Sequence, residues 1–382
     1  MTSQKHLFEL EDGTHYLNAA YMSPLLKSVY DAGIAGMRRK LNPSQIQADD
    51  FFSGAEDVKK RFAQLINAPS KQIAIIPSAS YGLKAAVNNI PTASGSHAIV
   101  VGNDFPSDHY TMREWCRKNK KELKVIEPIN VPDRAAAWSE KIVNAITNET
   151  SAVMLSTIHW ADGTKFNLKE IGSRCKEMGA YFIADGTQSV GALPLDVEDL
   201  KIDALVCAAY KWLMGPYSIG LAYYSEVFND GAPLEDSWMT RSNAHDFSGL
   251  TRYVDDYIPG AGRYNMGEFS NFIHMPMLSQ GLQQLEQWGV SSIQGYCDNL
   301  IKPLLNCLRD LGYWYENDEY RASHLFGFLL PPNVDKKTFL QELQINKVFV
   351  SVRGDIIRIS PHVYNDDEDI EALMAVLKRN GR

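Results

Sequence analysis

The stretch AVMLSTIHWADGTKFNLKEIGSRCKEMGAYFIAD, residues 152–185, decides the fold of this chain. It begins and ends with short runs, AVMLSTI (152–158) and YFIAD (181–185), that are nearly all apolar and do not alternate with polar residues. Such runs are typical of strands covered on both faces. Between them, LKEIGSRCKEMG (168–179) has the pattern of a helix that ends on a glycine after a lysine in its last turn. The stretch therefore predicts a strand–helix–strand unit with parallel strands.

The same alternation extends from about residue 55 to residue 230. Four further apolar runs are predicted to be buried strands: IAIIP (73–77), AIVVG (98–102), ALVCAAY (204–210) and IGLAYY (219–224). Alternation over this length predicts an α/β fold with a large, mainly parallel sheet. Ligands bind at the carboxyl ends of the strands in such sheets, so the residues that follow each run are candidates for a site.

After about residue 230 the sequence changes character. Residues 231–272 are rich in Gly, Asp, Ser, Tyr and Arg, which predicts long loops. A long helical pattern (about 276–312) precedes short strands around LFGFLLP, KVFVSVRG and IIRISP, and DEDIEALMAVLKR predicts a last amphipathic helix. We expect a large α/β domain over residues 15–275 and a smaller α+β domain over 276–382, with residues 1–14 packing near the small domain.

Composition excludes several classes of protein. A chain of 382 residues is long enough for two domains. A net charge of -8 argues against a nucleic-acid binder, and no apolar run approaches the length of a membrane span. The N-terminal residues lack the apolar stretch of a signal peptide, and the five scattered cysteines fit reduced thiols, neither a disulfide framework nor a zinc site. We expect a cytoplasmic protein without a metal, nucleic-acid or membrane partner.

Lys211 is the first candidate for chemistry, because it lies in AAYKW (208–212) at the end of an apolar strand. Burial disfavours the ammonium form, and a neutral amine is what a Schiff base requires. A lysine that extends from the strand end into water explains the position equally well. Asp185 closes the strand of YFIADGTQSVGA (181–192), where its carboxylate could pair with a protonated pyridine nitrogen or cap the next turn. Together the two residues favour a pyridoxal phosphate site at one edge of the sheet.

A phosphate site is the third element. In IIPSASYGLKAA (75–86), Ser78, Ala79 and Ser80 stand where a strand leads into a helix. The backbone N–H groups and the dipole of a helix N-terminus attract phosphate. A serine that simply caps the helix is the alternative, and the two interpretations are compatible.

With these residues in view, the chain resembles the class V aminotransferase branch of the fold-type-I pyridoxal phosphate enzymes. This branch includes cysteine desulfurases, kynureninases and isopenicillin N epimerase-like proteins. The resemblance covers nearly the whole chain, from YLNAAYMSPL (16–25) to IRISPHVYNDDEDIEAL (357–373). It implies pyridoxal 5'-phosphate as cofactor, an amino acid as substrate and a homodimer with active sites at the subunit interface.

The resemblance implies a role for each residue around the cofactor ring. Lys211 would be the Schiff-base lysine, and Asp185 would be the partner of the pyridine nitrogen. Gln188 would donate a hydrogen bond to the ring oxygen or the Schiff base. The run DFPSDHY (104–110) is similar to kynureninases in particular, where the phenylalanine packs on the ring. This places Phe105, with Ser107 and Asp108, among the cofactor-binding residues, although Phe105 could be ordinary core and Asp108 an ordinary turn residue.

The resemblance also assigns the phosphate and the substrate. Ala79, Ser80 and Tyr210 would contact the phosphate, and Asn271 of MGEFSNF (266–272) would reach the phosphate of the neighbouring subunit.

Arg358 would bind the substrate carboxylate with its planar guanidinium, although a structural ion pair is the alternative. Asn18, in the opening motif, and Trp160 would contact the substrate. His159 and Trp160 stand where desulfurases have Ser-Asn, so His159 is placed with the cofactor, although such an aromatic pair is often just packing.

The chain departs from the desulfurases in two further places. Ala208 replaces a serine that often binds phosphate, and YENDEYRASHLFG (315–327) lacks the nucleophilic cysteine that a persulfide mechanism needs. We therefore expect an aminotransferase-like enzyme that acts on an amino acid through the Schiff base of Lys211 and an external aldimine. A kynureninase-like or other Cβ-lyase, an epimerase, and a non-catalytic cofactor-binding homologue remain alternatives.

Overall fold

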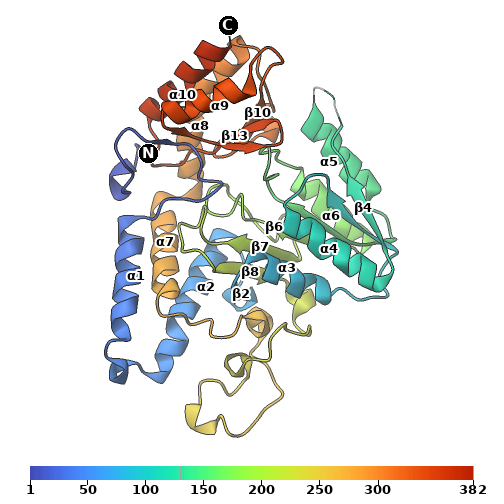
Figure 1. Ribbon diagram of the computed structural model, residues 1–382. Helices are drawn as coiled ribbons and strands as arrows, with labels where there is room; N and C mark the ends of the chain where they lie inside the picture. The colour runs from blue at the N-terminus through green and yellow to red at the C-terminus, as the bar shows by residue number, and fades with distance from the viewer. Residues whose placement is uncertain (130, 132, 382) are drawn as a thin grey trace.

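The computed structural model describes residues 1–129, 131 and 133–381, and its centre is a seven-stranded sheet (Figure 1). The strand order is β2-β8-β7-β6-β5-β3-β4. The strands are β2 (Ile73–Ile76), β3 (His97–Val101), β4 (Glu122–Ile126), β5 (Thr150–Ser156), β6 (Tyr181–Asp185), β7 (Ala204–Ala208) and β8 (Gly220–Tyr224). All neighbours are parallel except the two pairs that β8 makes, with β2 and with β7. The prediction of a large, mainly parallel sheet is confirmed.

The six strands predicted from apolar runs are all present, and one further strand was missed. β4 has the sequence ELKVI and lies at the edge of the sheet, where it pairs with β3 alone. Its residues Glu122 and Val125 are exposed. An edge strand keeps polar residues on its outer positions, so it lacks the continuous apolar run that marks the central strands.

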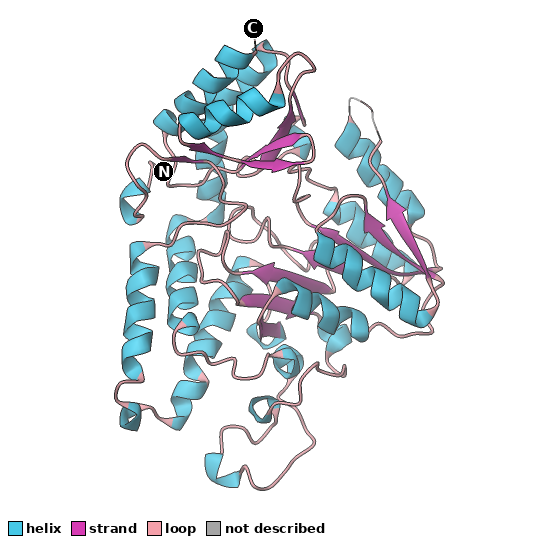
Figure 2. Cartoon of the chain, viewed as in Figure 1, coloured by secondary structure: helices cyan, strands magenta, loops and turns pink. Residues whose placement is uncertain are grey.

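Helices cover both faces of the sheet, which is why the central strands are apolar throughout (Figure 2). Alternate residues of one strand enter different hydrophobic clusters: Val153 and Leu155 of β5 pack on one face, Ala152 and Met154 on the other. The first face is covered by α2 (Ser53–Leu65), α5 (Arg134–Ala145), α6 (Leu168–Met178) and α7 (His274–Trp288), with α1 (Lys27–Arg39) packed on α7. The second face is covered by α3 (Ala79–Asn88) and α4 (Pro106–Asn119).

The C-terminal part of the chain forms a second layer with its own core, drawn in red and orange in Figure 1. A four-stranded sheet, in the order β12-β13-β10-β9, packs with three helices. These elements are α8 (Val290–Asp310), β9 (Trp314–Tyr315), β10 (Phe326–Leu329), α9 (Lys336–Ile345), β12 (Ser351–Arg353), β13 (Ile356–Ile359) and α10 (Asp367–Asn380). A separate parallel pair joins β1 (His15–Tyr16) to β11 (Val348–Phe349). The predicted smaller α+β domain is confirmed in kind, while its boundary at residue 276 stays a prediction.

The N-terminal residues contact this C-terminal part. Lys5 forms an ion pair with Asp366 at 2.8 Å, and the backbone N–H of Gln4 donates to the carbonyl oxygen of Val363 at 2.6 Å.

The long helix expected over 276–312 is two helices. α7 and α8 meet at Gly289, whose φ is 75°. Glycine adopts this backbone conformation readily, whereas residues with a Cβ are strained there. Leu285 of α7 packs in the core of the large sheet, and Leu304 of α8 packs in the core of the small one. The helical periodicity is continuous in sequence, but the bend lets each half serve a different core.

Residues 231–272 form the predicted long loops, with short 3-10 turns as their regular structure (Figure 2). In the part of the chain that the structure describes, no helix combines the length and the apolar character needed to cross a bilayer.

The bend at Gly289 makes the first testable prediction. Gly289→Ala should lower the free energy of unfolding by about 1–3 kcal/mol, because alanine is strained at this backbone conformation. Gly295 is the matched control: it lies inside α8 with open space where a Cβ would stand. Gly295→Ala should instead stabilise by roughly 0.5–1 kcal/mol, through helix propensity. Urea unfolding of both variants checks the pair, and equal effects would contradict it.

Candidate active site

A cavity of about 220 Å³ opens where the carboxyl ends of β3, β5, β6 and β7 meet. Many residues singled out from the sequence line it: Ala79, Ser80, Phe105, Ser107, Trp160, Asp185, Gln188, Tyr210 and Lys211. Asn18, Asp108, His159, Asn271 and Arg358 are not among the lining residues. The structure therefore brings together residues from widely separated parts of the sequence at the predicted edge of the sheet.

Lys211 follows β7 and is buried, with 6% of its surface exposed. Its ammonium nitrogen lies 5.8 Å from the ring centroid of Phe105 and 5.4 Å from that of Tyr210. Among the described residues, none of the ion pairs includes Lys211. Burial, followed by the charge of Arg358, lowers the pKa of Lys211 to about 8 against the opposing effect of Asp185. The lowered pKa favours the uncharged amine, which is the form that attacks a carbonyl.

Asp185 is the last residue of β6 and is also buried. Its Oδ1 accepts a hydrogen bond from the backbone N–H of Thr187 at 2.8 Å. The Thr187 hydroxyl accepts from the N–H of Ala208 at 3.1 Å, which ties the ends of β6 and β7 together. Burial raises the pKa of Asp185, while the hydrogen bonds of Thr187 and the charge of Lys211 act the other way. The Asp185 carboxylate and the Lys211 amine line one cavity and form no ion pair with each other. Both groups therefore remain available to a ligand.

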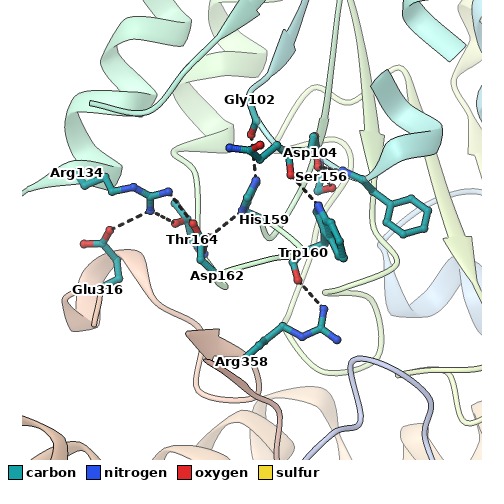
Figure 3. A network of polar contacts seen from close by, with 12 residues as sticks. Gly102, Asp104, Arg134, Ser156, His159, Trp160, Asp162, Thr164, Glu316 and Arg358 are labelled. Atoms are coloured by element: carbon teal, nitrogen blue, oxygen red, sulfur yellow. Dashed lines mark hydrogen bonds and ion pairs between the residues drawn. The ribbon is translucent and has the colours of Figure 1, made fainter. Parts of the chain in front are cut away.

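Two more carboxyl groups lie beneath Asp185. Asp104, three residues after the end of β3, accepts the N–H of Ser156 at 2.9 Å, and the Ser156 hydroxyl also donates to it (Figure 3). Asp108 is fully buried, and its nearest donor is Ser156 at 3.4 Å. Burial, followed by the charges of Asp185 and Asp104, raises the pKa of Asp108 well above its usual range. Burial and the neighbouring acids therefore disfavour the charged form of Asp108, whereas the charged form of Asp185 is supported by the hydrogen bond from Thr187.

The turn before α3 forms another wall of the cavity. The Ser78 hydroxyl accepts the N–H of Tyr81 at 3.3 Å, so the interpretation of Ser78 as a helix cap is confirmed. Ser80 lies 3.0 Å from Ser78, oxygen to oxygen. The first N–H groups of a helix have no acceptor within the helix, and here they stand at the cavity. Contact of Ala79 and Ser80 with phosphate stays a prediction that this geometry permits.

Two aromatic side chains enclose the cavity from the side of β3 and β5. The rings of Phe105 and Trp160 meet edge to face with centroids 5.5 Å apart. The Trp160 indole N–H donates to the carbonyl oxygen of Asn103 at 2.8 Å, and the N–H of Phe105 donates to its neighbour Asp104 at 2.8 Å. Both rings are thus fixed by the strand ends that carry them.

Arg358 reaches this region from β13 of the small sheet (Figure 3). Its Nη1 donates to the carbonyl oxygen of Trp160 at 2.6 Å, and its Nη2 donates to the Ser351 hydroxyl at 3.3 Å. Ser351 in turn donates to Asn18 Oδ1 at 2.7 Å. Only 1% of the Arg358 surface is exposed, and no carboxylate pairs with it within the described ranges. Burial, with the charge of Arg353, lowers the pKa of Arg358 to about 9.

His159 lies behind the cavity in a network of ion pairs (Figure 3). Its Nδ1 is 2.9 Å from Asp162 Oδ1, and its Nε2 is 3.2 Å from the carbonyl oxygen of Gly102. Asp162 also pairs with Arg134 at 2.6 Å, and Arg134 lies 4.0 Å from Glu316. Burial opposes protonation of His159, but the charge and the hydrogen bond of Asp162, together with the charge of Asp104, outweigh burial and raise the pKa of His159. Here the residue supports the loop that carries Trp160, and its contact with a cofactor stays a prediction.

Asn271 stands away from the cavity, at the start of α7. Its Oδ1 accepts the N–H of Ile273 at 3.0 Å and that of His274 at 2.9 Å, so it caps this helix. Its contact with a phosphate in a neighbouring subunit stays a prediction.

Sequence reasoning missed several lining residues: Pro77, Ser156, Thr187, Tyr217, Ser218 and Ile219. Ser156 and Thr187 stand at the carboxyl ends of β5 and β6, where the rule for parallel strands could have found them. Tyr217 and Ser218 precede β8, which is antiparallel to its neighbours. The amino end of β8 therefore lies at this edge, and a rule based on carboxyl ends overlooks it.

The sequence of this chain is similar to those of known proteins. A family model described as aminotransferase class-V matches residues 34–373. An uncharacterized aminotransferase of Bacillus subtilis, YcbU, is 24% identical over 329 residues, which covers 82% of this chain and 80% of the relative. A probable cysteine desulfurase of Pyrococcus abyssi is 26% identical over 355 residues, which covers 85% and 82%.

Two solved structures are similar over their whole length. A mutant of C-DES with glycine covalently linked to its pyridoxal phosphate has a TM-score of 0.87 at 18% identity, covering 98% of this chain and 99% of that one. The apo cysteine desulfurase from Thermococcus onnurineus has a TM-score of 0.84 at 20% identity, covering 99% and 98%. They confirm the predicted fold class.

The buried amine of Lys211 makes stability depend on pH. Its folded-state pKa of about 8 lies below the ordinary value of 10.5, so the unfolded chain binds more protons between these two pH values. Stability of the apoprotein should therefore rise with pH across this window, by up to about 3 kcal/mol relative to the Lys211→Met variant. Urea unfolding of both proteins from below pH 8 to above pH 10 measures the difference, and parallel curves would contradict the lowered pKa.

Proposed function

Since this chain belongs to the aminotransferase class-V family, whose enzymes use pyridoxal 5'-phosphate on amino acids, we propose that Lys211 is its cofactor-binding lysine and transamination its reaction. One observation carries the proposal. A buried lysine with a lowered pKa and no ion pair among the described residues shares its cavity with a buried carboxylate. A lysine in that state is costly to keep unless its amine is used.

The residues present fit the cofactor on structural grounds. The cavity offers an amine for the aldehyde, an anion for the pyridine nitrogen, and a helix N-terminus for the phosphate, from Lys211, Asp185 and the Ser78–Ser80 turn respectively. When bound, pyridoxal phosphate supplies an electron sink for the electrons of a bond broken at the substrate Cα.

The protein divides the work of positioning among fixed groups. The Ser78–Ser80 turn would hold the phosphate, with Tyr210 beside it, and Phe105 would pack on the ring. Gln188 is prepared for a polar contact, because its Oε1 already accepts from the Trp212 indole at 3.0 Å and its Nε2 donates to the Ala20 carbonyl oxygen at 3.2 Å. One N–H of the Gln188 amide remains for a ring substituent.

Proton transfer would rest with Lys211. With a pKa of about 8, the amine can accept a proton from Cα near neutral pH and return it to a second carbon. Arg358 would bind the carboxylate of the substrate, since its guanidinium is buried, points to Trp160 and pairs with no carboxylate in the part of the chain described. Trp160 and Phe105 would exclude water from the reacting carbon.

A Cβ-lyase is the second candidate. It is favoured by the run DFPSDHY (104–110), which resembles kynureninases and which the structure places against the cavity through Phe105 and Ser107. Persulfide chemistry has less support, because residues 315–327 hold no cysteine and all five cysteines of the chain are buried. The five free thiols also support the cytoplasmic location that we propose.

The functional prediction is tested on the purified holoenzyme. It should absorb visible light, and borohydride should fix the cofactor covalently to Lys211 but not in Lys211→Ala. Amino acids alone should bleach the absorbance and leave pyridoxamine phosphate. A protein that shows no absorbance after addition of pyridoxal phosphate would refute cofactor binding, and kynurenine converted to anthranilate and alanine would replace transamination by Cβ cleavage.

We also propose a homodimer in which Asn271 serves the partner's phosphate. Apolar side chains exposed around α1 and the loops near Asn271 support such an interface; they include Tyr30, Met37, Leu41, Trp238, Phe247 and Ile273.

Mixed dimers test this arrangement. Asn271→Asp keeps an oxygen for the α7 cap but repels phosphate, and Lys211→Ala removes the amine. If Asn271 acts across the interface, mixing the two variants in equal amounts should restore about a quarter of wild-type activity, because half the dimers contain one intact site. If Asn271 acts within its own subunit, no mixed dimer contains an intact site, and activity stays at the level of the separate variants. If Asn271 does not contact phosphate, Asn271→Asp alone keeps wild-type activity.

A further inference from the structure

Arg353, the last residue of β12, is a second arginine at this site that the proposed mechanism does not use. Its guanidinium carbon lies 5.2 Å from the ring centroid of Trp160. Its Nη1 donates to the carbonyl oxygen of Val352 at 2.8 Å, and its buried Nε has no hydrogen-bond partner. Asp355, the acid nearest in sequence, pairs with Lys336 at 3.1 Å. Within residues 1–129, 131 and 133–381, no ion pair includes Arg353.

The two arginines contact one residue of the cavity wall. Arg358 donates to the backbone carbonyl of Trp160, and Arg353 lies over its indole ring. They belong to one antiparallel hairpin, in which Ser351 pairs with Arg358 and Arg353 pairs with Ile356. Burial lowers the pKa of Arg353, and the charge of Arg353 in turn lowers the pKa of both Arg358 and Lys211. The guanidinium groups therefore repel each other, and the neighbouring acids do not compensate them.

A single carboxylate would leave this imbalance in place. The α-carboxylate of an amino acid would neutralise one guanidinium, and Arg358 is the more buried of the two and already faces the cavity wall through Trp160. The charge of Arg353 would remain, held over the indole ring of Trp160. Partly buried cations are stable when paired, so a ligand with two separated anionic groups would satisfy both arginines.

We propose that Arg353 binds an anionic group on the substrate side chain, so that the enzyme acts on acidic amino acids while Arg358 holds the α-carboxylate. This inference rests on the proposed function and names its substrate class. The planar guanidinium suits a carboxylate or sulfinate, and the indole face beneath it restricts its orientation. Arg353 acts as a specificity-determining residue, with no part in the chemistry at Cα.

The holoenzyme tests this with pairs of substrates that differ in one charge: aspartate against asparagine, and glutamate against glutamine. We expect the acidic member to be favoured in kcat/KM, and Arg353→Gln to lower that kcat/KM by about 10- to 100-fold, mainly through KM. The neutral member should change by less than about threefold in the same variant. Arg353→Lys should restore part of the preference. Arg117→Gln is the control for net charge, because Arg117 is exposed on α4 and pairs with Glu114.

A binding measurement separates this inference from the reaction. Calorimetry should show that succinate binds the holoenzyme more tightly than butanoate does, and that Arg353→Gln removes the difference. If the holoenzyme turns over neutral amino acids as well as acidic ones, and Arg353→Gln affects both alike, the inference is wrong while the proposed function stands. If the protein does not bind pyridoxal phosphate, the proposed function fails, and equal binding of succinate and butanoate would then overturn the arginine pair independently.

Discussion

The exclusion of water from the carboxyl edge of the sheet governs this molecule. Burial lowers the pKa of Lys211 and raises the pKa of Asp185, and both effects have one cause, because both buried residues line the same cavity. Helices cover both faces of the parallel sheet, so the space for a ligand lies at the carboxyl ends of its strands. The polar groups there are held by neighbours such as Thr187 and Ser156, which satisfy the carboxylates without neutralising them.

The small domain completes the site through very few contacts. Arg358 crosses from β13 to the Trp160 carbonyl, and Trp160 is itself fixed to the end of β3. The ion pairs of His159, Asp162 and Arg134 hold the segment around Trp160 from behind, and Glu316 extends this network into the C-terminal part (Figure 3). In the function that we propose, substrate recognition lies at a junction between two separate hydrophobic cores: the large domain carries Lys211 and Asp185, and the small domain carries the two arginines.

The features of the fold and the site that could be predicted from the sequence are those set by residues close together in the chain. The central strands were identifiable because both of their faces are buried, and Lys211 and Asp185 were identifiable because each closes such a strand. β4 was missed because an edge strand has one side open to water, and the bend at Gly289 was missed because periodicity reports the helix and not its direction. The family resemblance placed His159 with the cofactor, which stays a prediction; the hydrogen bond and ion pairs of His159 with Asp162 and of Asp162 with Arg134 could not be predicted, because only the fold brings these residues together. The sequence could not show that Arg353 lacks an acidic partner among the described residues. That became clear only from the structure, in which Asp355, the acid nearest in sequence, pairs with Lys336.

The buried Asp162 carboxylate is shared by two partners, because it lies between His159 and Arg134. The charges of these two partners hold the pKa of Asp162 below its usual range in spite of burial. Replacing the aspartate alone would leave His159 and Arg134 without their shared acceptor, and replacing either of these partners alone would leave the buried carboxylate with one partner fewer. Substitutions at these three positions are therefore coupled in evolution. A change at one of them is tolerated when compensating changes occur at the others, or when an intermediate sequence tolerates a less rigid segment around Trp160.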